Sequence, residues 1–233
     1  MREKYPVLAG MLDFVFPPLC AGCGRFDESA EGICESCRNA INTFSVPICL
    51  SCESVLAEDA RCPVCNDRVF PLFALGNYKS PLREIIIQFK FRNVLGSVEL
   101  LATQFANIYT SQLKKLSADC LVPVPLHPYR EHRRGYNQAC VVAEALVTHL
   151  ELPVRTDFIK RTEKRRPQAR LNYAQRVRNI KGVFSILQEK SAQERILLVD
   201  DVVTTGATVT EAKKVLEDAG HKVVGVIALA HGV

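Results

Sequence analysis

The sequence predicts an α/β fold, a mainly parallel sheet with helices on both faces, preceded by a small N-terminal zinc-binding module. Eight of the ten cysteines form four Cys-x-x-Cys pairs within the first 65 residues. After residue 68, apolar strand-like runs alternate with helix-like segments, a pattern typical of parallel sheets with helical crossovers. We therefore expect an N-terminal helix and zinc ribbon at 1–68 and an α/β domain at 69–233.

Hydrophobic periodicity and turn residues give the expected elements of the second unit. Strands are expected at 72–78, 119–125, 152–159, 182–186, 195–199 and 222–229. Helices are expected at 82–91, 101–116, 137–150 and 208–219. Gly220 should end the last helix, because glycine suits a left-handed C-terminal cap. The segment 160–181 is polar and weakly periodic, which predicts a loop with some helix.

Composition and the N-terminal segment narrow the class of protein. Apolar residues make up 48% of the 233 residues, which excludes wholesale disorder. The chain has no apolar run of the roughly 18 residues that a membrane-spanning helix needs. The apolar segment 6–18 is interrupted by Asp13, and no small-residue cleavage site follows it, so we expect a short amphipathic helix and not a signal peptide. The expected location is cytoplasmic.

The four cysteine pairs predict zinc sites. The pairs are Cys20/Cys23, Cys34/Cys37, Cys49/Cys52 and Cys62/Cys65, separated by ten, eleven and nine residues. Disulfides are disfavoured in a reducing compartment, and two Cys-x-x-Cys turns can complete one tetrahedral zinc site. Two zinc ions are therefore expected, with sequential or interleaved pairing of the turns. Their role should be structural first, with a partner surface second; Cys120 and Cys140 should be core residues.

The segment 196–208 (Ile-Leu-Leu-Val-Asp-Asp-Val-Val-Thr-Thr-Gly-Ala-Thr) predicts a site for a phosphorylated ribose. Its strand would end at two carboxylates at the carboxyl edge of the sheet, where open α/β folds bind ligands. Adjacent carboxylates can hold ribose hydroxyls or hydrated Mg2+. The turn into a helix supplies N–H groups and hydroxyls for a monophosphate. The predicted binding residues are Asp200, Asp201, Thr204, Thr205, Gly206, Ala207 and Thr208, and the predicted ligand is phosphoribosyl pyrophosphate with Mg2+.

Basic residues are concentrated at 127–181, where thirteen Lys and Arg face five Asp and Glu. This imbalance indicates a local anionic partner, pyrophosphate or nucleic acid, although a solvated loop rich in Arg is the alternative. In a transferase, 160–181 could fold over bound pyrophosphate; in a DNA-binding protein it could follow a single strand. The candidate contacts are Lys90, His127, Arg133, Arg134, Arg165, Arg166 and Arg176, and Arg130 lies in the same turn as His127.

Further motifs extend across almost the whole chain. They are Phe-Pro-Pro-Leu-Cys at 16–20, Tyr-Lys-Ser-Pro-Leu-Arg at 78–83, Val-Pro-Val-Pro-Leu-His at 122–127, Arg-Arg-Gly-Tyr-Asn-Gln at 133–138, and Arg161, Pro167-Gln168, Arg176 and Asn179. With the segment 196–208, which resembles the phosphoribosyl pyrophosphate motif of type I phosphoribosyltransferases, they resemble the ComF family. The resemblance implies a zinc module joined to a phosphoribosyltransferase-like domain. It also implies a cytoplasmic role in natural transformation, with single-stranded DNA and a competence-machinery protein as partners.

Two features bear on catalysis. Transferases acting on 6-oxopurines carry an acidic residue two positions before the motif glycine, and Thr204 occupies that position here. We expect no hood after the last expected strand, so a hood would have to come from 69–95 or from the zinc module. Three functions stay open: a competence factor that handles nucleic acid, an active phosphoribosyltransferase on an unknown acceptor, and a regulator that senses phosphoribosyl pyrophosphate.

Overall fold

The structure, a computed structural model, describes residues 17–27, 32–56, 62–65, 69–92, 96–162, 182–187 and 192–232. The strands are β1 (Ile48–Cys49), β2 (Pro71–Asn77), β3 (Cys120–Pro123), β4 (Ile159–Arg161), β5 (Phe184–Ile186), β6 (Arg195–Val203) and β7 (Lys222–His231). The helices are α2 (Glu35–Asn39), α3 (Leu82–Arg92), α4 (Gly96–Lys115), α5 (Pro128–Arg134), α6 (Gln138–Leu150) and α8 (Ala207–Asp218). Most of the N-terminal helix expected at 6–18 lies outside the described residues.

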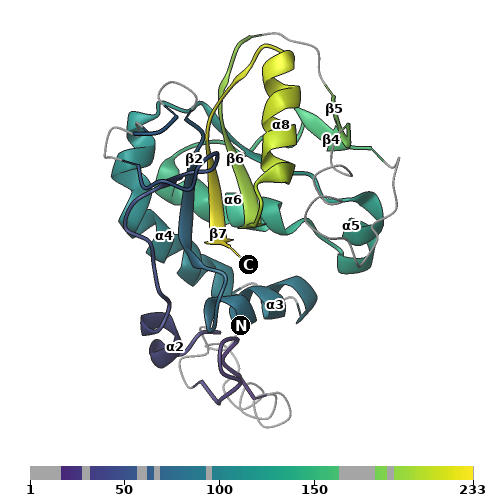
Figure 1. Cartoon of the computed structure of the whole chain (residues 1–233). Coiled ribbons are helices and arrows are strands. Elements are labelled where there is room, and N and C mark those ends of the chain that lie inside the picture. Colours follow the sequence, from purple (N-terminus) through teal and green to yellow (C-terminus); the bar gives the residue numbers. More distant parts are fainter. Residues whose placement is uncertain are drawn as a thin grey trace.

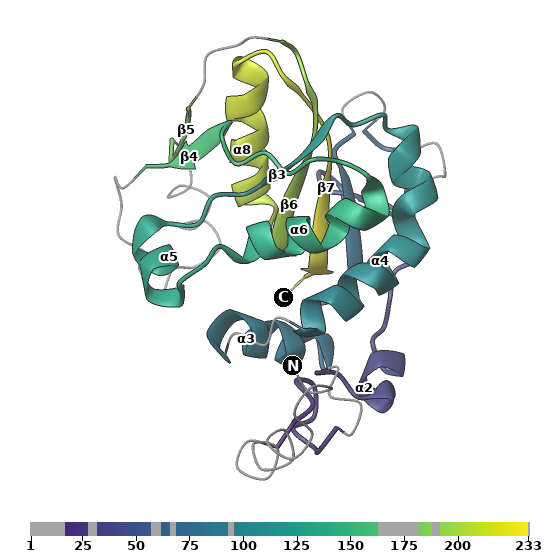
Figure 2. The same ribbon diagram turned by 180° about the vertical axis from the view of Figure 1, so that it is seen from behind.

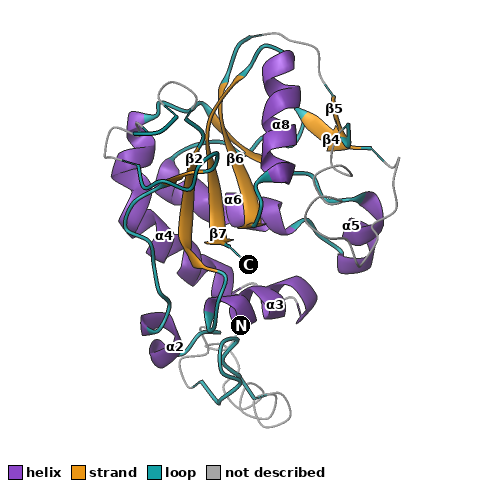
Figure 3. Cartoon of the chain, viewed as in Figure 1, coloured by secondary structure: helices purple, strands orange, loops and turns teal. Residues whose placement is uncertain are grey.

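The central sheet has the strand order β1-β2-β7-β6-β3, and β4 pairs with β5 in a separate antiparallel sheet. Strands β2, β7, β6 and β3 are parallel, and β1 pairs antiparallel at the edge. Helix α8 covers one face of this sheet (Figure 1), and α4 and α6 cover the other (Figure 2). Helix α3 lies beyond the carboxyl ends of the parallel strands (Figure 3). The predicted α/β architecture is confirmed.

Strand β6 is buried on both faces, because successive side chains of a strand point to opposite sides. Ile196 and Leu198 lie in the core that includes Val209 of α8, whereas Leu197 and Val199 lie in the core of the opposite face. Burial on both sides explains why residues Ile196–Val199 of this strand are uninterruptedly apolar instead of alternating.

The described part of the cysteine-rich region joins the edge of this sheet. The Phe44 N–H donates to the Leu75 carbonyl at 2.9 Å, beside β1. The buried Tyr109 of α4 brings its hydroxyl to 3.2 Å from the Phe44 carbonyl and 3.0 Å from the Ala74 carbonyl. Helix α4 thus contacts both β2 and the segment around Phe44 that leads into β1. The division between two units near residue 68 stays a prediction.

Several predicted elements are confirmed within a few residues. The strands expected at 72–78, 119–125, 182–186 and 222–229 correspond to β2, β3, β5 and β7, and the helices expected at 82–91, 137–150 and 208–219 to α3, α6 and α8. Gly220 follows α8 with a φ of 89°. Its N–H donates to the Glu217 carbonyl at 2.9 Å and the His221 N–H donates to the Leu216 carbonyl at 3.1 Å, the Schellman arrangement that glycine favours.

Three expectations are corrected. Strand β6 continues to Val203, so the two carboxylates lie within the strand and not after it. Helix α4 begins at Gly96, five residues earlier than expected. The strand expected at 152–159 is wrong: one bridge joins Val154 to Leu121, and the next strand begins at Ile159. Pro153 has no N–H to donate, which limits pairing there.

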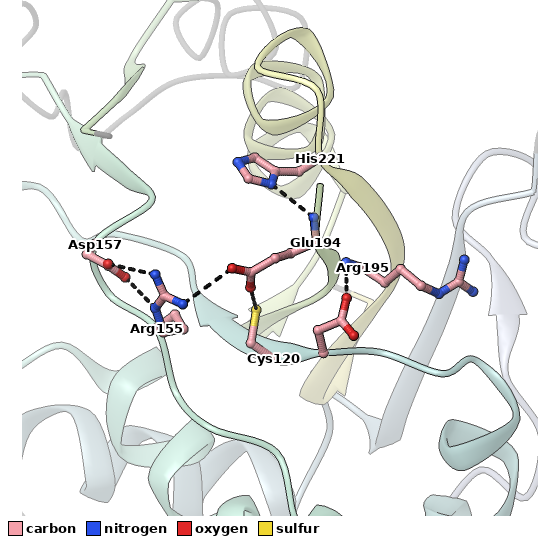
Figure 4. Close-up of polar contacts among 7 residues, drawn as sticks. Cys120, Arg155, Asp157, Glu194, Arg195 and His221 are labelled. Carbon is pink, nitrogen blue, oxygen red and sulfur yellow. Dashed lines mark hydrogen bonds and ion pairs between the residues drawn. The ribbon is translucent and has the colours of Figure 1, made fainter. Parts of the chain in front are cut away.

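Polar contacts link the segments at the amino ends of the parallel strands, opposite the carboxyl ends where the two carboxylates lie (Figure 4). Glu194 accepts a hydrogen bond from the Cys120 thiol at 3.3 Å and pairs with Arg155 at 3.4 Å. Arg155 also pairs with Asp157 at 2.9 Å. Burial, reinforced by Glu194, raises the pKa of Cys120 to about 12. Cys120 is therefore a core thiol, as predicted, whereas Cys140 is only partly buried.

Candidate functional site

Two adjacent carboxylates lie near the carboxyl end of β6. Asp200 is in register with Ala228 of β7 and lines a small cavity at the start of α8. Asp201 forms a 2.9 Å ion pair with Lys90 of α3. Neighbouring side chains of a strand diverge to opposite faces, yet both carboxylates border one cavity of ≈ 170 Å³ because it lies at the end of the sheet.

The loop 204–208 comprises the turn after β6 and the first two residues of α8, and it lines the small cavity of ≈ 30 Å³. Gly206 is the N-cap of α8 and has a φ of 71°, a left-handed conformation that favours glycine. The Ala207 N–H donates to the Thr205 hydroxyl at 3.3 Å. The first N–H groups of a helix have no partner within the helix, so this cup can bind an anionic oxygen cluster. The structure brings Asp200 and the whole predicted loop together.

Basic side chains face the two carboxylates across the larger cavity. They are Lys90 of α3, Arg130 and Arg134 of α5, and Arg161 of β4. Partial burial and the charge of Arg130 lower the pKa of Arg161, while Asp200 opposes the shift. Among the described residues, the lining of this cavity therefore carries more positive than negative charge, which attracts an anionic ligand.

Asp200 titrates abnormally for a carboxyl group. Its burial and the neighbouring charge of Asp201 raise its pKa from 3.8 to about 7. A 2.9 Å hydrogen bond from the Asp201 N–H and the charges of Lys90 and Arg161 oppose that shift. Carboxyl groups with strongly shifted pKa values are typical of functional sites.

A second cleft of ≈ 440 Å³ continues from the first cavity between α3 and α5. Its lining residues are Lys90, Phe91, Arg130, Arg133, Arg134 and Tyr136. The Arg134 guanidinium lies 5.0 Å from the centre of the Phe91 ring, and the Arg133 guanidinium lies 6.0 Å from that of Tyr129. Phe91 is 68% exposed and Tyr129 is 58% exposed. Cations beside exposed aromatic faces suit a ligand that is both planar and anionic.

The remaining candidate contacts divide into two groups. His127 is buried as the N-cap of α5, where its Nδ1 accepts a hydrogen bond from the Tyr129 N–H at 3.2 Å. Arg165, Arg166 and Arg176 lie outside the described residues. Sequence reasoning named Arg161 as a motif residue within a basic segment but did not place it at the site. It missed Phe91, because nothing local shows that either residue would reach the cavities.

The eight paired cysteines form two clusters. One contains Cys20, Cys23, Cys34 and Cys37, and the other contains Cys49, Cys52, Cys62 and Cys65, with the sulfurs of each cluster within 4.8 Å of one another. Zinc–sulfur bonds of about 2.3 Å in a tetrahedron place sulfurs roughly 3.8 Å apart. The Sγ–Sγ distances of 3.9 Å for Cys23–Cys34 and 3.9 Å for Cys49–Cys65 match this geometry. The pairing is sequential, and the clusters fit two zinc ions.

Comparison with known proteins gives matches over both parts of the chain. A double zinc ribbon domain matches residues 11–67, and a phosphoribosyl transferase domain matches residues 136–232. Competence protein F of Haemophilus influenzae is 34% identical, over 91% of this chain and 96% of that protein. Competence protein ComFC of Bacillus subtilis is 30% identical over 82% of this chain and 80% of its own length. DNA utilization protein YhgH of Escherichia coli is 31% identical over 85% and 89%.

Within the described ranges, no helix is both long and apolar enough to cross a membrane.

Proposed function

The chain belongs to the family of competence proteins F and ComFC, and from this membership we propose that it binds phosphoribosyl pyrophosphate with Mg2+. One observation carries the proposal: a single cavity brings together Asp200, Asp201 and Thr208 with four basic side chains from three other elements. Each part of that ligand has a chemically suitable counterpart at this edge of the sheet.

We assign the parts of the ligand by their chemistry. The 5-phosphate suits the N–H groups and hydroxyls of the loop 204–208. The carboxylates of Asp200 and Asp201 suit ribose hydroxyls or the hydrated Mg2+ that accompanies the ligand. Charge-assisted hydrogen bonds from the arginines and Lys90 suit the pyrophosphate oxygens.

A calorimetric titration with Mg2+ and phosphoribosyl pyrophosphate tests this proposal. Asp200→Asn should weaken binding by at least ~10-fold, since charged hydrogen bonds contribute roughly 1.5–3 kcal/mol. Asp218→Asn is the matched control, because it removes an exposed carboxylate from the far end of α8. Saturable binding that is lost only in the first variant supports the proposal; no binding by the unaltered protein, or equal effects, would overturn it.

A second proposed function is the handling of single-stranded DNA in the cytoplasm during natural transformation, with a protein partner in the competence machinery. The cleft of ≈ 440 Å³ between α3 and α5 supports it, because single-strand-binding proteins combine a basic groove with aromatic faces that stack on bases. The names of the relatives, competence and DNA utilization proteins, point the same way. Arg165, Arg166 and Arg176 belong to this proposal as further phosphate contacts.

Fluorescence anisotropy with a labelled oligonucleotide tests the second function. Affinity should fall steeply with salt, because phosphate contacts release counterions. Phe91→Ala should weaken binding roughly 10-fold, as expected for the loss of one stacked base, and the Arg165→Ala/Arg166→Ala variant should reduce the salt dependence. Phe26, which is 58% exposed in the zinc-ligating region, provides the control Phe26→Ala. Unchanged affinity in Phe91→Ala would remove the cleft from this function.

Transfer to an acceptor stays a separate alternative. Helix α3 lies within 69–95, one of the two regions from which a hood would have to come, and it borders the cavity and contributes Lys90. Thr204 offers no carboxylate for acid–base catalysis at the position used by 6-oxopurine transferases. Pyrophosphate release, screened against bases, distinguishes the cases: release would establish a transferase, and binding without release would leave a sensor or a DNA-handling factor.

A further inference from the structure

The cluster of Cys49, Cys52, Cys62 and Cys65, the second along the chain, packs directly against the loop 204–208. Leu50 lies in the knuckle between Cys49 and Cys52, and its N–H donates to the Phe70 carbonyl at 2.9 Å. Its side chain packs onto Gly206: a Cβ placed on Gly206 would lie 2.8 Å from both Cγ and Cδ2 of Leu50. Gly206, the residue of the loop with a left-handed conformation, is thus packed against the zinc-ligating knuckle through Leu50.

The cluster of Cys20, Cys23, Cys34 and Cys37, the first along the chain, packs against the start of α3, the helix that borders the cavity through Lys90. Gly22 lies between Cys20 and Cys23, and a Cβ placed there would lie 2.9 Å from the Cys37 sulfur and 3.3 Å from Cβ of Pro81. Pro81 directly precedes α3. The buried residues of this cluster belong to the same apolar core as the inner face of α3. That helix carries Lys90 to Asp201.

We infer that the two zinc clusters position different walls of the ribose-phosphate site: the second positions the loop 204–208 through Leu50, and the first positions α3 and Lys90 through Gly22 and Pro81. Four-cysteine knuckles of this size are ordered chiefly by their metal. A knuckle that loses zinc regains backbone freedom, so its packed neighbour loses the surface that restricts it. Leu50 is a positioning residue, because it acts through Gly206 and not on the ligand itself.

Hydrogen exchange of the folded full-length protein provides the test, because it follows local opening without requiring a ligand. Cys52→Ser should lower zinc content from two ions to one. It should also raise exchange at the start of α8 by ~10-fold or more, measured at Thr210, whose N–H donates to the Gly206 carbonyl at 2.9 Å, and should leave α3 unchanged. Cys23→Ser should do the reverse, with faster exchange in α3 and an unchanged loop. This crossed pattern separates two local effects from a general loss of stability.

Leu50 variants test the same inference with both zinc sites intact. Leu50→Ala should keep two zinc ions, speed exchange in the loop and weaken binding of phosphoribosyl pyrophosphate. Leu50→Met, which keeps the volume of the side chain, should restore both. This pair decides the matter if the cysteine variants fail to fold.

Three results would overturn the inference: equal loosening of both walls by either cysteine variant, no loosening by either, or unchanged loop exchange in Leu50→Ala. The description of these walls as a ligand site depends on the proposed function. If the unaltered protein binds no phosphoribosyl pyrophosphate, that function fails, while the exchange pattern still decides whether each cluster positions its own wall.

Discussion

Lys90 Nζ lies 2.9 Å from Asp201 Oδ2, which joins α3 to the carboxyl end of β6. The two side chains are only 16% and 14% exposed, so the pair is largely shielded from water. The pair places a cation of the neighbouring helix against one of the two motif carboxylates. A ligand that brings Mg2+ to the carboxylates would compete with Lys90 for Asp201 and offer Lys90 a phosphate instead.

Lys90→Gln should therefore discriminate between ligands. We expect at least ~10-fold weaker binding of phosphoribosyl pyrophosphate, about 1.4 kcal/mol, and a smaller change for ribose 5-phosphate, which lacks the pyrophosphate. Calorimetric titration of both ligands measures the difference. Equal losses for the two ligands would mean that Lys90 acts only by holding α3 in place.

Asp200 should make both stability and binding depend on pH. Its raised pKa of about 7 means that the folded protein retains a proton that the unfolded chain releases above its usual 3.8. Protonation of this group therefore adds to the free energy of unfolding in full below pH 3.8, and this added stability is lost as pH rises to about 7. Ligand that requires the carboxylate should bind more tightly as pH rises from about 6 to about 8.

The variant Asp200→Asn isolates that effect, because the phosphates of the ligand also titrate in this range. Affinity measured across the same pH series should rise less steeply in the variant than in the unaltered protein. Parallel pH profiles for the two proteins would show that Asp200 contributes nothing to the dependence.

Tyr109→Phe should lower the free energy of unfolding by about 1 kcal/mol or more, the usual effect of losing a buried hydrogen bond. Its hydroxyl is the group that links α4 to the Phe44 and Ala74 carbonyls. Urea denaturation measures the change. Tyr129→Phe, at an exposed tyrosine, should have a small effect; similar losses in both variants would contradict the assigned role of Tyr109.

Cys120 should resist alkylation in the folded, zinc-loaded protein. The thiol is 1% exposed and has a pKa raised to about 12, and the reactive form of cysteine is the thiolate. Mass spectrometry after iodoacetamide treatment near neutral pH measures modification of each cysteine, with urea-unfolded protein as the fully reactive control. Rapid modification of Cys120 without unfolding would contradict its burial.

Local sequence patterns predicted the elements whose burial follows a period. Runs such as Ile196–Val199 are apolar because both faces are covered, and Gly220 marks a helix end by its own backbone preference. Helix α5 was missed as an element because it buries none of its residues, so no apolar periodicity indicates it. Pro128 at its first position is the signal that could have revealed it.

The assembly of the site depends on contacts between distant segments. The sequence identified Asp200, Asp201 and the loop 204–208, which are contiguous. It did not indicate that Arg161 would face Asp200, because a basic segment gives each of its arginines the same local character. Nor could cysteine spacing show that Leu50 would pack onto Gly206.

A crystal structure of the protein with phosphoribosyl pyrophosphate and Mg2+ would show directly whether this cavity is the ligand site. We expect the 5-phosphate within the loop 204–208, the ribose or Mg2+ at Asp200 and Asp201, and the pyrophosphate beside Lys90 and the arginines of α5. Ligand bound elsewhere, or absent from this cavity under saturating conditions, would contradict the claim.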